Sequence, residues 1–245
     1  MSGTIGQGRI KAVCFDFMGT CLDWHSSIVA ILPDRLSETE RSRLALEWRQ
    51  RYFDANTERQ ATGQPPEDID ITHRRTLHEL LSRPEQASVE TLFTPEVVDV
   101  AVAAWHKQKA WPDVRAAIQS LSERGWEVYV HANGTTRLQL DLVKSSGLRF
   151  DMLFSSQLLG VYKPAPEAYN KGLELIKRAP EECVMVAAHA YDLRGARAIG
   201  MKTVYVYRWT DDVWEDQAVV RKEHDAYLED MEGLGDVIEM LGRQC

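Results

Sequence analysis

Four groups of polar side chains in this sequence have the types and positions expected of a catalytic site. Asp16 follows a short apolar run and precedes Gly19 and Thr20, and a glycine there lets the backbone approach a ligand closely. A carboxylate in such a place is suited to nucleophilic attack. Lys163 would hold Asp16 ionised and position an anionic substrate. The two other groups are 133–136 and 189–192.

Each of these groups lies at the end of an expected β-strand or in a loop that follows one. Near-continuous apolar runs at 10–17, 126–131, 184–189 and 203–207 are typical of parallel strands covered on both faces. Stretches with helical spacing lie between them, at 113–123, 137–146 and 166–178. This alternation predicts βαβ units and a doubly wound, Rossmann-like parallel sheet. Ligands bind beyond the carboxyl ends of the strands in such sheets, so the four groups should meet there.

Residues 25–109 have a different, helical pattern. Ser37 and Glu40 form a capping box that opens a helix to about residue 58, and 63–67 is a loop. A second helix is expected at 72–81. Thr94 and Pro95 begin a third, which should run to about Lys109. The sequence therefore predicts an α/β core domain, 1–24 and 110–245, interrupted by a helical domain, 25–109.

The composition limits the class of protein and of partner. The chain has 245 residues, 44% of them hydrophobic, and a formal net charge of -8. That length and composition can bury a full core, and an acidic balance does not suit nucleic acid. No apolar run is long enough to span a bilayer, and the first residues lack the pattern of a signal peptide. We therefore expect a cytoplasmic protein that binds neither nucleic acid nor membrane.

Four segments match, in order, the motifs of one known family. Asp16–Thr20 reads D-x-x-G-T, Asn133-Gly134 follows an expected strand, and Lys163–Tyr169 reads K-P-x-P-x-x-Y. The fourth segment, Ala187–Asp192, is followed by Gly195-Ala196-Arg197. This set resembles the haloacid dehalogenase-like (HAD) hydrolases, and within them the type II (S)-2-haloacid dehalogenase branch. The helical insertion then resembles the cap domain of that branch.

The resemblance implies hydrolytic dehalogenation of a small 2-haloacid, without a metal or another cofactor. Asp16 would attack C2 with inversion and form an aspartyl ester. Water placed by Thr20, Lys163 and Asp192 would then hydrolyse the ester. His189 would receive the halide or substrate carboxylate, or act as a base, and Trp48-Arg49-Gln50 matches the context of the family's halide-facing arginine. The residues expected to contact the anionic substrate are Phe17, Met18, Arg49, Asn133, Tyr169 and Tyr191. The resemblance also implies a homodimer formed through the cap.

Two other functions remain open. HAD phosphatases usually carry a second aspartate two residues after the nucleophile, and here that position is Met18, which cannot protonate a leaving alkoxide. A phosphatase or phosphonatase-like enzyme would use Mg²⁺ on Asp16 and Asp192. The family's dehalogenases have serines where this chain has Ala132 and Ala187, so a third possibility is a repurposed protein that binds a metabolite without catalysis.

Overall fold

The computed structural model describes residues 10–64 and 67–243. Pro65 and Pro66 of the expected loop, and Cys245, lie outside these residues. The chain divides into two compact units, Met1–Leu22 with Ala110–Cys245, and Asp23–Lys109. The larger is an α/β unit and the smaller is helical, and a short two-stranded sheet of β2 (Leu22–Asp23) and β3 (Lys109–Ala110) lies where the chain passes from one to the other. That the helical unit acts as a cap stays a prediction.

The α/β unit is built on a parallel sheet of six strands with the order β5-β4-β1-β6-β7-β8. The strands are β1 (Ala12–Phe15), β4 (Glu127–Ala132), β5 (Met152–Ser155), β6 (Cys183–Ala187), β7 (Lys202–Val206) and β8 (Ala226–Leu228). The doubly wound parallel sheet is thereby confirmed. Because β1 lies between β4 and β6, the chain changes direction across the sheet at β1, which is where such sheets bind ligands.

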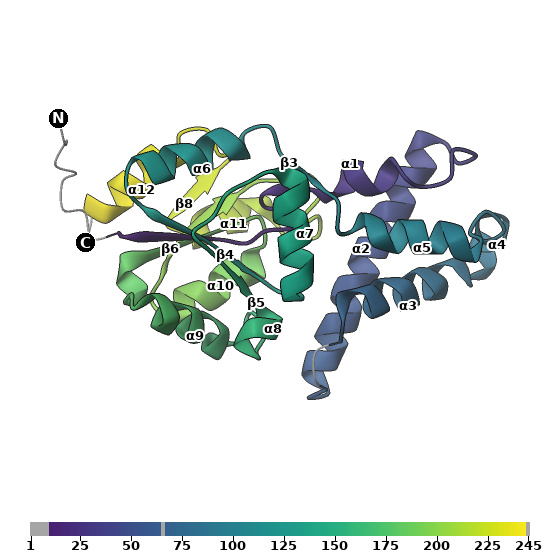
Figure 1. Cartoon of the computed structure of the whole chain (residues 1–245), viewed down its shortest axis with the longest axis horizontal. Coiled ribbons are helices and arrows are strands. Elements are labelled where there is room, and N and C mark those ends of the chain that lie inside the picture. Colours follow the sequence, from purple (N-terminus) through teal and green to yellow (C-terminus); the bar gives the residue numbers. More distant parts are fainter. Residues whose placement is uncertain (1–9, 65–66, 244–245) are drawn as a thin grey trace. The chain divides into compact units, whose positions relative to one another are not determined.

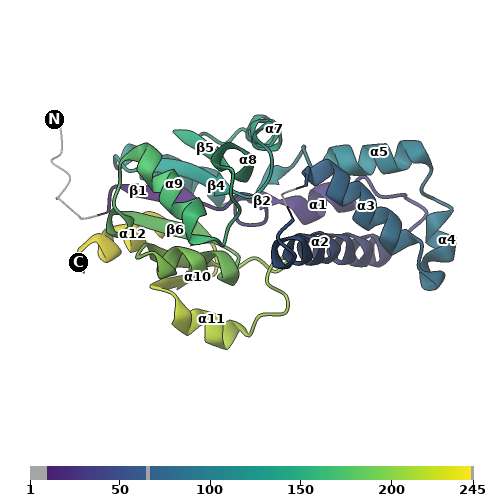
Figure 2. The same cartoon turned by 90° about the horizontal axis from the view of Figure 1, so that it is seen from below.

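Helices cover both faces of this sheet (Figures 1 and 2). On one face lie α9 (Pro166–Ile176) and α10 (Ala190–Ala198), over a core that includes Cys14, Tyr129 and Met185 of the central strands. On the other face lie α6 (Val114–Glu123) and α12 (Leu234–Arg243), which pack against each other. The remaining helices of the unit are α7 (Thr136–Ser146), α8 (Ser156–Leu159), α11 (Gln217–Glu223) and the 3₁₀ turn η2 (Pro180–Glu182).

The helical unit begins with α1 (Trp24–Val29) and α2 (Glu38–Ala61). Ser37 and Glu40 bond to each other's backbone amides at 2.8 and 3.3 Å, which confirms the capping box. The unit continues with α3 (Ile69–Leu81), η1 (Pro84–Gln86), α4 (Ala87–Glu90) and α5 (Pro95–Ala104). The expectation that the last helix reaches Lys109 was wrong. It ends at Ala104, and Trp105 turns into a buried aromatic core with Trp24 and Trp48.

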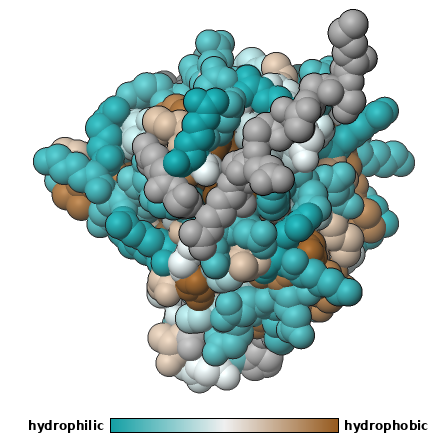
Figure 3. Space-filling model, turned by 90° about the vertical axis from the view of Figure 1, so that its left-hand side faces the viewer, coloured by the Kyte–Doolittle hydropathy of each residue, from teal (hydrophilic) through white to brown (hydrophobic). Residues whose placement is uncertain are grey.

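Two edge strands, β5 and β8, were not expected from the sequence. Met152 of β5 is 42% exposed and β8 is only half-buried, so neither forms the continuous apolar run of a central strand. The face of the molecule in Figure 3 is mostly hydrophilic, with apolar side chains in small groups, as is normal for a globular surface. Within the described part of the chain, no helix combines the length and apolarity needed to cross a membrane.

Candidate active site

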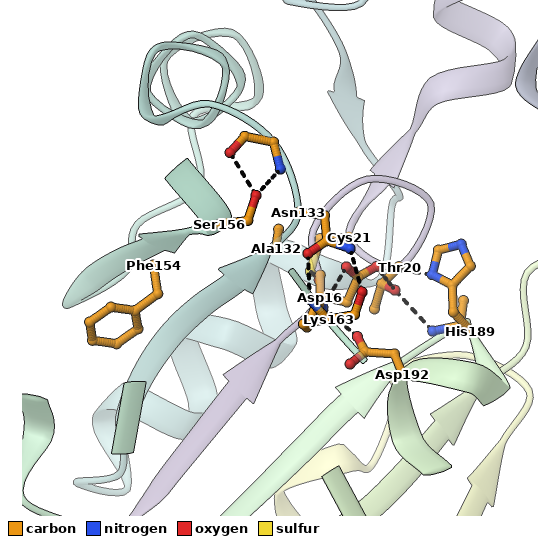
Figure 4. A network of polar contacts seen from close by, with 12 residues as sticks. Asp16, Thr20, Cys21, Ala132, Asn133, Phe154, Ser156, Lys163, His189 and Asp192 are labelled. Carbon is orange, nitrogen blue, oxygen red and sulfur yellow. Dashed lines mark hydrogen bonds and ion pairs between the residues drawn. The ribbon is translucent and has the colours of Figure 1, made fainter. Parts of the chain in front are cut away.

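The candidate active site lies where β1, β4, β6 and β7 end. Asp16 follows β1 directly, Asn133 follows β4, and His189 comes two residues after β6. Lys163 comes from the loop between α8 and α9. Parallel strands end at the same edge, and the structure brings together Asp16, Thr20, Lys163, His189 and Asp192, all five predicted as catalytic (Figure 4).

The Asp16 carboxylate is buried, and donors hold both of its oxygens. Oδ1 accepts a hydrogen bond from the Lys163 ammonium at 3.1 Å. Oδ2 accepts from the Thr20 hydroxyl at 2.8 Å and lies 3.1 Å from Nδ1 of His189. Burial alone would raise the pKa of Asp16, but Lys163, His189 and Thr20 outweigh it and hold the pKa well below its usual range. Asp16 is therefore an ionised carboxylate with a neutralising cation on each side.

The Lys163 ammonium bridges Asp16 and Asp192. It is almost fully buried and pairs with Oδ2 of Asp192 as well as with Asp16 (Figure 4). Burial lowers the pKa of a lysine, but the two carboxylates more than offset this and raise it. Asn133 fixes the backbone of Lys163, since its side-chain amide bonds to both the carbonyl and the N–H group of that residue. The predicted role of Asn133 in substrate contact stays a prediction.

Asp192 lies in the first turn of α10, which begins at Ala190 with His189 as its N-cap. The hydroxyl of Tyr169 donates to Oδ1 of Asp192 at 2.7 Å. Burial raises the pKa of Asp192 even though Lys163 lowers it. The ring of Tyr169 is buried beneath the site, and contact of this residue with substrate stays a prediction.

His189 lies between two carboxylates, and the second of them, Asp211, was missed by the sequence analysis. Nδ1 faces Asp16, and Nε2 lies 3.1 Å from Oδ1 of Asp211. Burial would lower the pKa of the imidazole, but the bonds to Asp16 and Asp211 raise it to about 10. Asp211 belongs to the loop after β7, and its signal was available: Thr210-Asp211-Asp212 comes three residues after the expected parallel strand at 203–207.

Several groups hold the Gly19-Thr20 turn next to Asp16. The indole of Trp111 donates to the Gly19 carbonyl at 2.8 Å, and the Arg208 guanidinium donates to the Thr20 carbonyl at 3.1 Å. Arg208 is itself paired with Asp113 at 2.9 Å. The Thr20 hydroxyl also accepts from the amide of Ala188 at 2.9 Å, which ties the turn to the end of β6. The turn is therefore rigidly placed from three other segments.

Three residues predicted to contact the substrate through apolar surface, Phe17, Met18 and Tyr191, differ in how deeply they are buried. Phe17 is buried and its ring packs edge-on against Phe150, 5.5 Å away between centroids. Met18 lies next in the turn and is 9% exposed. Tyr191 is half-buried, with its ring beside that of His189. Of these three, Phe17 has the surroundings of a core residue, while Met18 and Tyr191 keep some exposed surface.

Arg49 belongs to the helical unit, where aromatic rings surround its guanidinium. The guanidinium carbon lies 4.5 Å from the ring centre of Phe53 and 5.5 Å from those of Tyr52 and Trp24. Trp105 is also within reach, at 5.7 Å. Arg49, Tyr52 and Phe53, all on α2, therefore contact one another. The guanidinium is therefore held in place by cation–π contacts with these ring faces.

The described residues do not offer a metal site: between 10–64 and 67–243, no three His, Cys, Asp or Glu side chains are grouped to hold an ion. Instead, the Lys163 ammonium occupies the space between the Asp16 and Asp192 carboxylates. Chemically, the arrangement provides an ionised carboxylate nucleophile, two cations that stabilise developing negative charge, and a second buried carboxylate able to take a proton.

Comparisons with known proteins find similar proteins over most of the chain. The family model of haloacid dehalogenase-like hydrolases matches residues 10–200. Haloacetate dehalogenase H-2 of Moraxella sp. (strain B) is 27% identical over 206 residues, 82% of this chain and 87% of that protein. The crystal structure of the L-2-haloacid dehalogenase PA0810 superposes with a TM-score of 0.79 at 28% identity, over 93% of this chain and 97% of that one. Pyrophosphatase PpaX of Bacillus mycoides (strain KBAB4) is 26% identical over 211 residues, 82% of this chain and 85% of that protein.

Proposed function

We propose that this chain, which belongs to the haloacid dehalogenase-like hydrolase family, is an enzyme that hydrolyses the carbon–halogen bond of small 2-haloacids. The products are the 2-hydroxy acid, with inverted configuration, and halide. The observation that carries the proposal is the state of Asp16: an ionised carboxylate with Met18 in place of the usual acid of a phosphatase. A halide leaving group needs no proton, whereas an alkoxide leaving from phosphorus does.

In the first step, an oxygen of Asp16 attacks C2 in line as the carbon–halogen bond breaks. Oδ1 is the better nucleophile, because Oδ2 is held by both Thr20 and His189 while Lys163 bonds to Oδ1. The bond that forms is Oδ1–C2, and the halide leaves with the electron pair. Arg49 is proposed to receive the halide, with Tyr191 and Met18 against the substrate, and these roles rest on the family resemblance, whereas both ring nitrogens of His189 already face carboxylates.

In the second step, water attacks Cγ of the resulting aspartyl ester. Asp192, whose pKa is raised by burial, takes a proton from the water and returns it to the departing alkoxide. The Cγ–Oδ1 bond breaks, so Oδ1 leaves with the product, the water oxygen stays on Asp16, and the second proton of the water is lost to solvent as the carboxylate ionises again. Lys163 lies between both carboxylates and stabilises the charge as it moves. The cycle uses no metal or other cofactor.

The direct test is halide release from both enantiomers of 2-chloropropionate, with Asp16→Asn as the inactive control. Single turnover in ¹⁸O-water should place the label in the tryptic peptide that holds Asp16 and leave the first molecule of product unlabelled. Halide release with label in the product would point to direct attack by water. Absence of halide from any haloacid, at protein concentrations that exceed the substrate, would overturn the proposal.

The other two functions predict different outcomes of the same assays. A phosphatase would release phosphate from an aryl phosphate only with added Mg²⁺, and its activity would disappear with a chelator. A metabolite-binding protein would form no covalent species on Asp16. We also propose that the chain works in the cytoplasm as a homodimer formed through its helical unit, which light scattering of the purified protein tests.

A further inference from the structure

Asp211 is a buried carboxylate that none of the family motifs contains, and it lies against His189. Its side chain is 1% exposed, with Oδ1 3.1 Å from Nε2 of His189. Its other oxygen accepts a hydrogen bond from the Thr210 hydroxyl at 2.7 Å. The ring nitrogens of His189 face Asp16 and Asp211, and these two contacts raise the pKa of the imidazole to about 10, so both nitrogens carry hydrogen. His189 is therefore a donor to Asp16.

The nucleophile turn is shaped to admit this carboxylate. Gly19 has a φ of +88°, and a Cβ at that position would lie 2.5 Å from Oδ1 of Asp211 and 2.7 Å from its Cγ. Such distances require one of the two groups to move, and a left-handed backbone already favours glycine. Asp211 is thus seated against the same D-x-x-G-T turn that carries Asp16, between the glycine and His189.

We propose that Asp211 is a positioning residue that holds His189 as a donor to Oδ2 of Asp16, so that His189 and Thr20 form the oxyanion hole for hydrolysis of the aspartyl ester. The inference rests on the proposed dehalogenation. When Oδ1 carries the alkyl group, Oδ2 is the carbonyl oxygen of the ester. The two donors already lie 3.1 and 2.8 Å from it, near the distances at which oxyanion-hole donors act.

His189 and Thr20 stabilise the negative charge that moves onto Oδ2 of Asp16 during hydrolysis. Attack of water on Cγ forms the new carbon–oxygen bond and moves the carbonyl electron pair onto Oδ2. The hydrogen bonds from His189 and Thr20 strengthen as that oxygen becomes negative. When the Cγ–Oδ1 bond breaks, the electron pair returns from Oδ2 and the carboxylate is restored. His189 keeps its proton throughout, so the proposed role differs from that of a base.

Formation of the ester changes the charges that face His189. In the free protein these are Asp16 from the loop after β1, and Asp211 and Asp212 from the loop after β7, with the Tyr191 ring alongside on α10. Burial raises the pKa of Asp212 to about 6, and its Oδ2 accepts from the amide of Ala190. Lys163 is paired with Asp16 and Asp192. Esterification removes the charge of Asp16, so Asp211 is then the ionic partner that remains bonded to the His189 ring.

The test variant is Asp211→Asn, which keeps the size of the side chain and removes its charge. In single turnover with excess protein, halide should be released at nearly the wild-type rate, while hydrolysis of the ester slows by about 10- to 100-fold. Intact-mass spectrometry should then detect the ester accumulating. The pH profile of hydrolysis should also change: the wild-type rate persists into alkaline solution, and the variant rate falls as pH rises through neutrality, where its His189 loses the proton.

Asp225→Asn is the matched control, because Asp225 is a carboxylate of the same unit that bonds to the Thr203 amide and Lys202, away from His189. It should leave both steps unchanged. Gly19→Ala, which crowds Asp211, should slow hydrolysis more than halide release. Lack of halide from the wild type would mean failure of the proposed function. If the wild type releases halide, and a folded Asp211→Asn protein hydrolyses the ester at the wild-type rate with an unchanged pH profile, the role of Asp211 is overturned and the proposed function is not.

Discussion

The side-chain amide of Asn133 makes one hydrogen bond to each backbone polar group of Lys163. Nδ2 donates to the Lys163 carbonyl at 3.0 Å, and Oδ1 accepts from the Lys163 amide at 2.9 Å. The loop after β4 therefore fixes the backbone from which the ammonium reaches Asp16 and Asp192. Asn133 was predicted to contact the substrate. In the structure, its side chain bonds to Lys163, the residue that pairs with the nucleophile Asp16.

Asn133→Ala should lower kcat by about 10- to 100-fold, because small displacements of a catalytic group have effects of that order. KM should change much less, since the Gly19-Thr20 turn is held by Trp111, Arg208 and Ala188 and not by Asn133. Steady-state halide release measures both constants. Gln119→Ala on the outer face of α6, whose side chain bonds to Glu123, serves as the control and should leave both constants unaltered. An increase in KM at unchanged kcat would instead favour direct contact with substrate.

Lys163→Met should lower the free energy of unfolding by about 3–5 kcal/mol, because removal of one partner leaves buried charge uncompensated. Here two carboxylates, Asp16 and Asp192, lose the same ammonium. Adding Asp192→Asn should recover part of the loss, as one of the two stranded charges is then gone. Urea unfolding at neutral pH measures the free energy of unfolding of the single and the double variant. Equal stability of the single and double variants would contradict the charge bridge, and both should be inactive.

Tyr169→Phe should slow ester hydrolysis and leave halide release nearly intact. The phenol donates to the side chain of Asp192, and burial raises the pKa of the Tyr169 hydroxyl, which stays protonated. Loss of this bond should cost about 1 kcal/mol of stability. Stopped-flow measurement of the two steps separates them. If halide release slowed and hydrolysis did not, Tyr169 would belong to the substrate pocket as the sequence predicts.

Arg49→Lys should slow the halide-releasing step on the order of 10²-fold, the effect of losing one well-placed charge donor. A lysine keeps the charge but lacks the planar group that stacks on Phe53 and Tyr52. Arg43→Lys, an exposed position on the same helix with a salt bridge to Glu47, is the control. The chloride-to-bromide rate ratio should change as well, and equal rates in all three proteins would exclude Arg49 from the reaction.

Stability should depend on the charge of His189 in alkaline solution. Its pKa is about 10 in the folded protein and about 6.5 when unfolded. The stabilisation from the charged ring is complete below the unfolded value and is lost as pH rises through the folded one. The difference in unfolding free energy between wild type and His189→Asn should therefore shrink by a few kcal/mol from pH 6.5 to 10, at about 1.4 kcal/mol per pKa unit. A difference that does not vary with pH would contradict the imidazolium.

Much of this site could be predicted because strand ends carry strong local signals. Asp16 and His189 lie at the ends of recognisable apolar runs, and parallel strands bring such ends together, while Lys163 opens the K-P-x-P-x-x-Y motif. Asp211 has a weaker signal, and its role depends on a glycine 192 positions earlier that has no Cβ. The hydrogen-bond partners of Asn133 and Tyr169 could not be predicted from the sequence either, because a polar side chain near the site can face either a ligand or a neighbouring protein group.

The central position of β1 has a consequence for biosynthesis. The nucleophile is made early, at residue 16, while its cationic partners Lys163 and His189 lie 147 and 173 residues later and Asp211 follows after them. Contacts of such long sequence separation form late, because the intervening chain must first be ordered. A nascent chain therefore carries Asp16 without the cations that activate it until most of the sheet has been synthesised. The activated nucleophile and the completed core therefore form together.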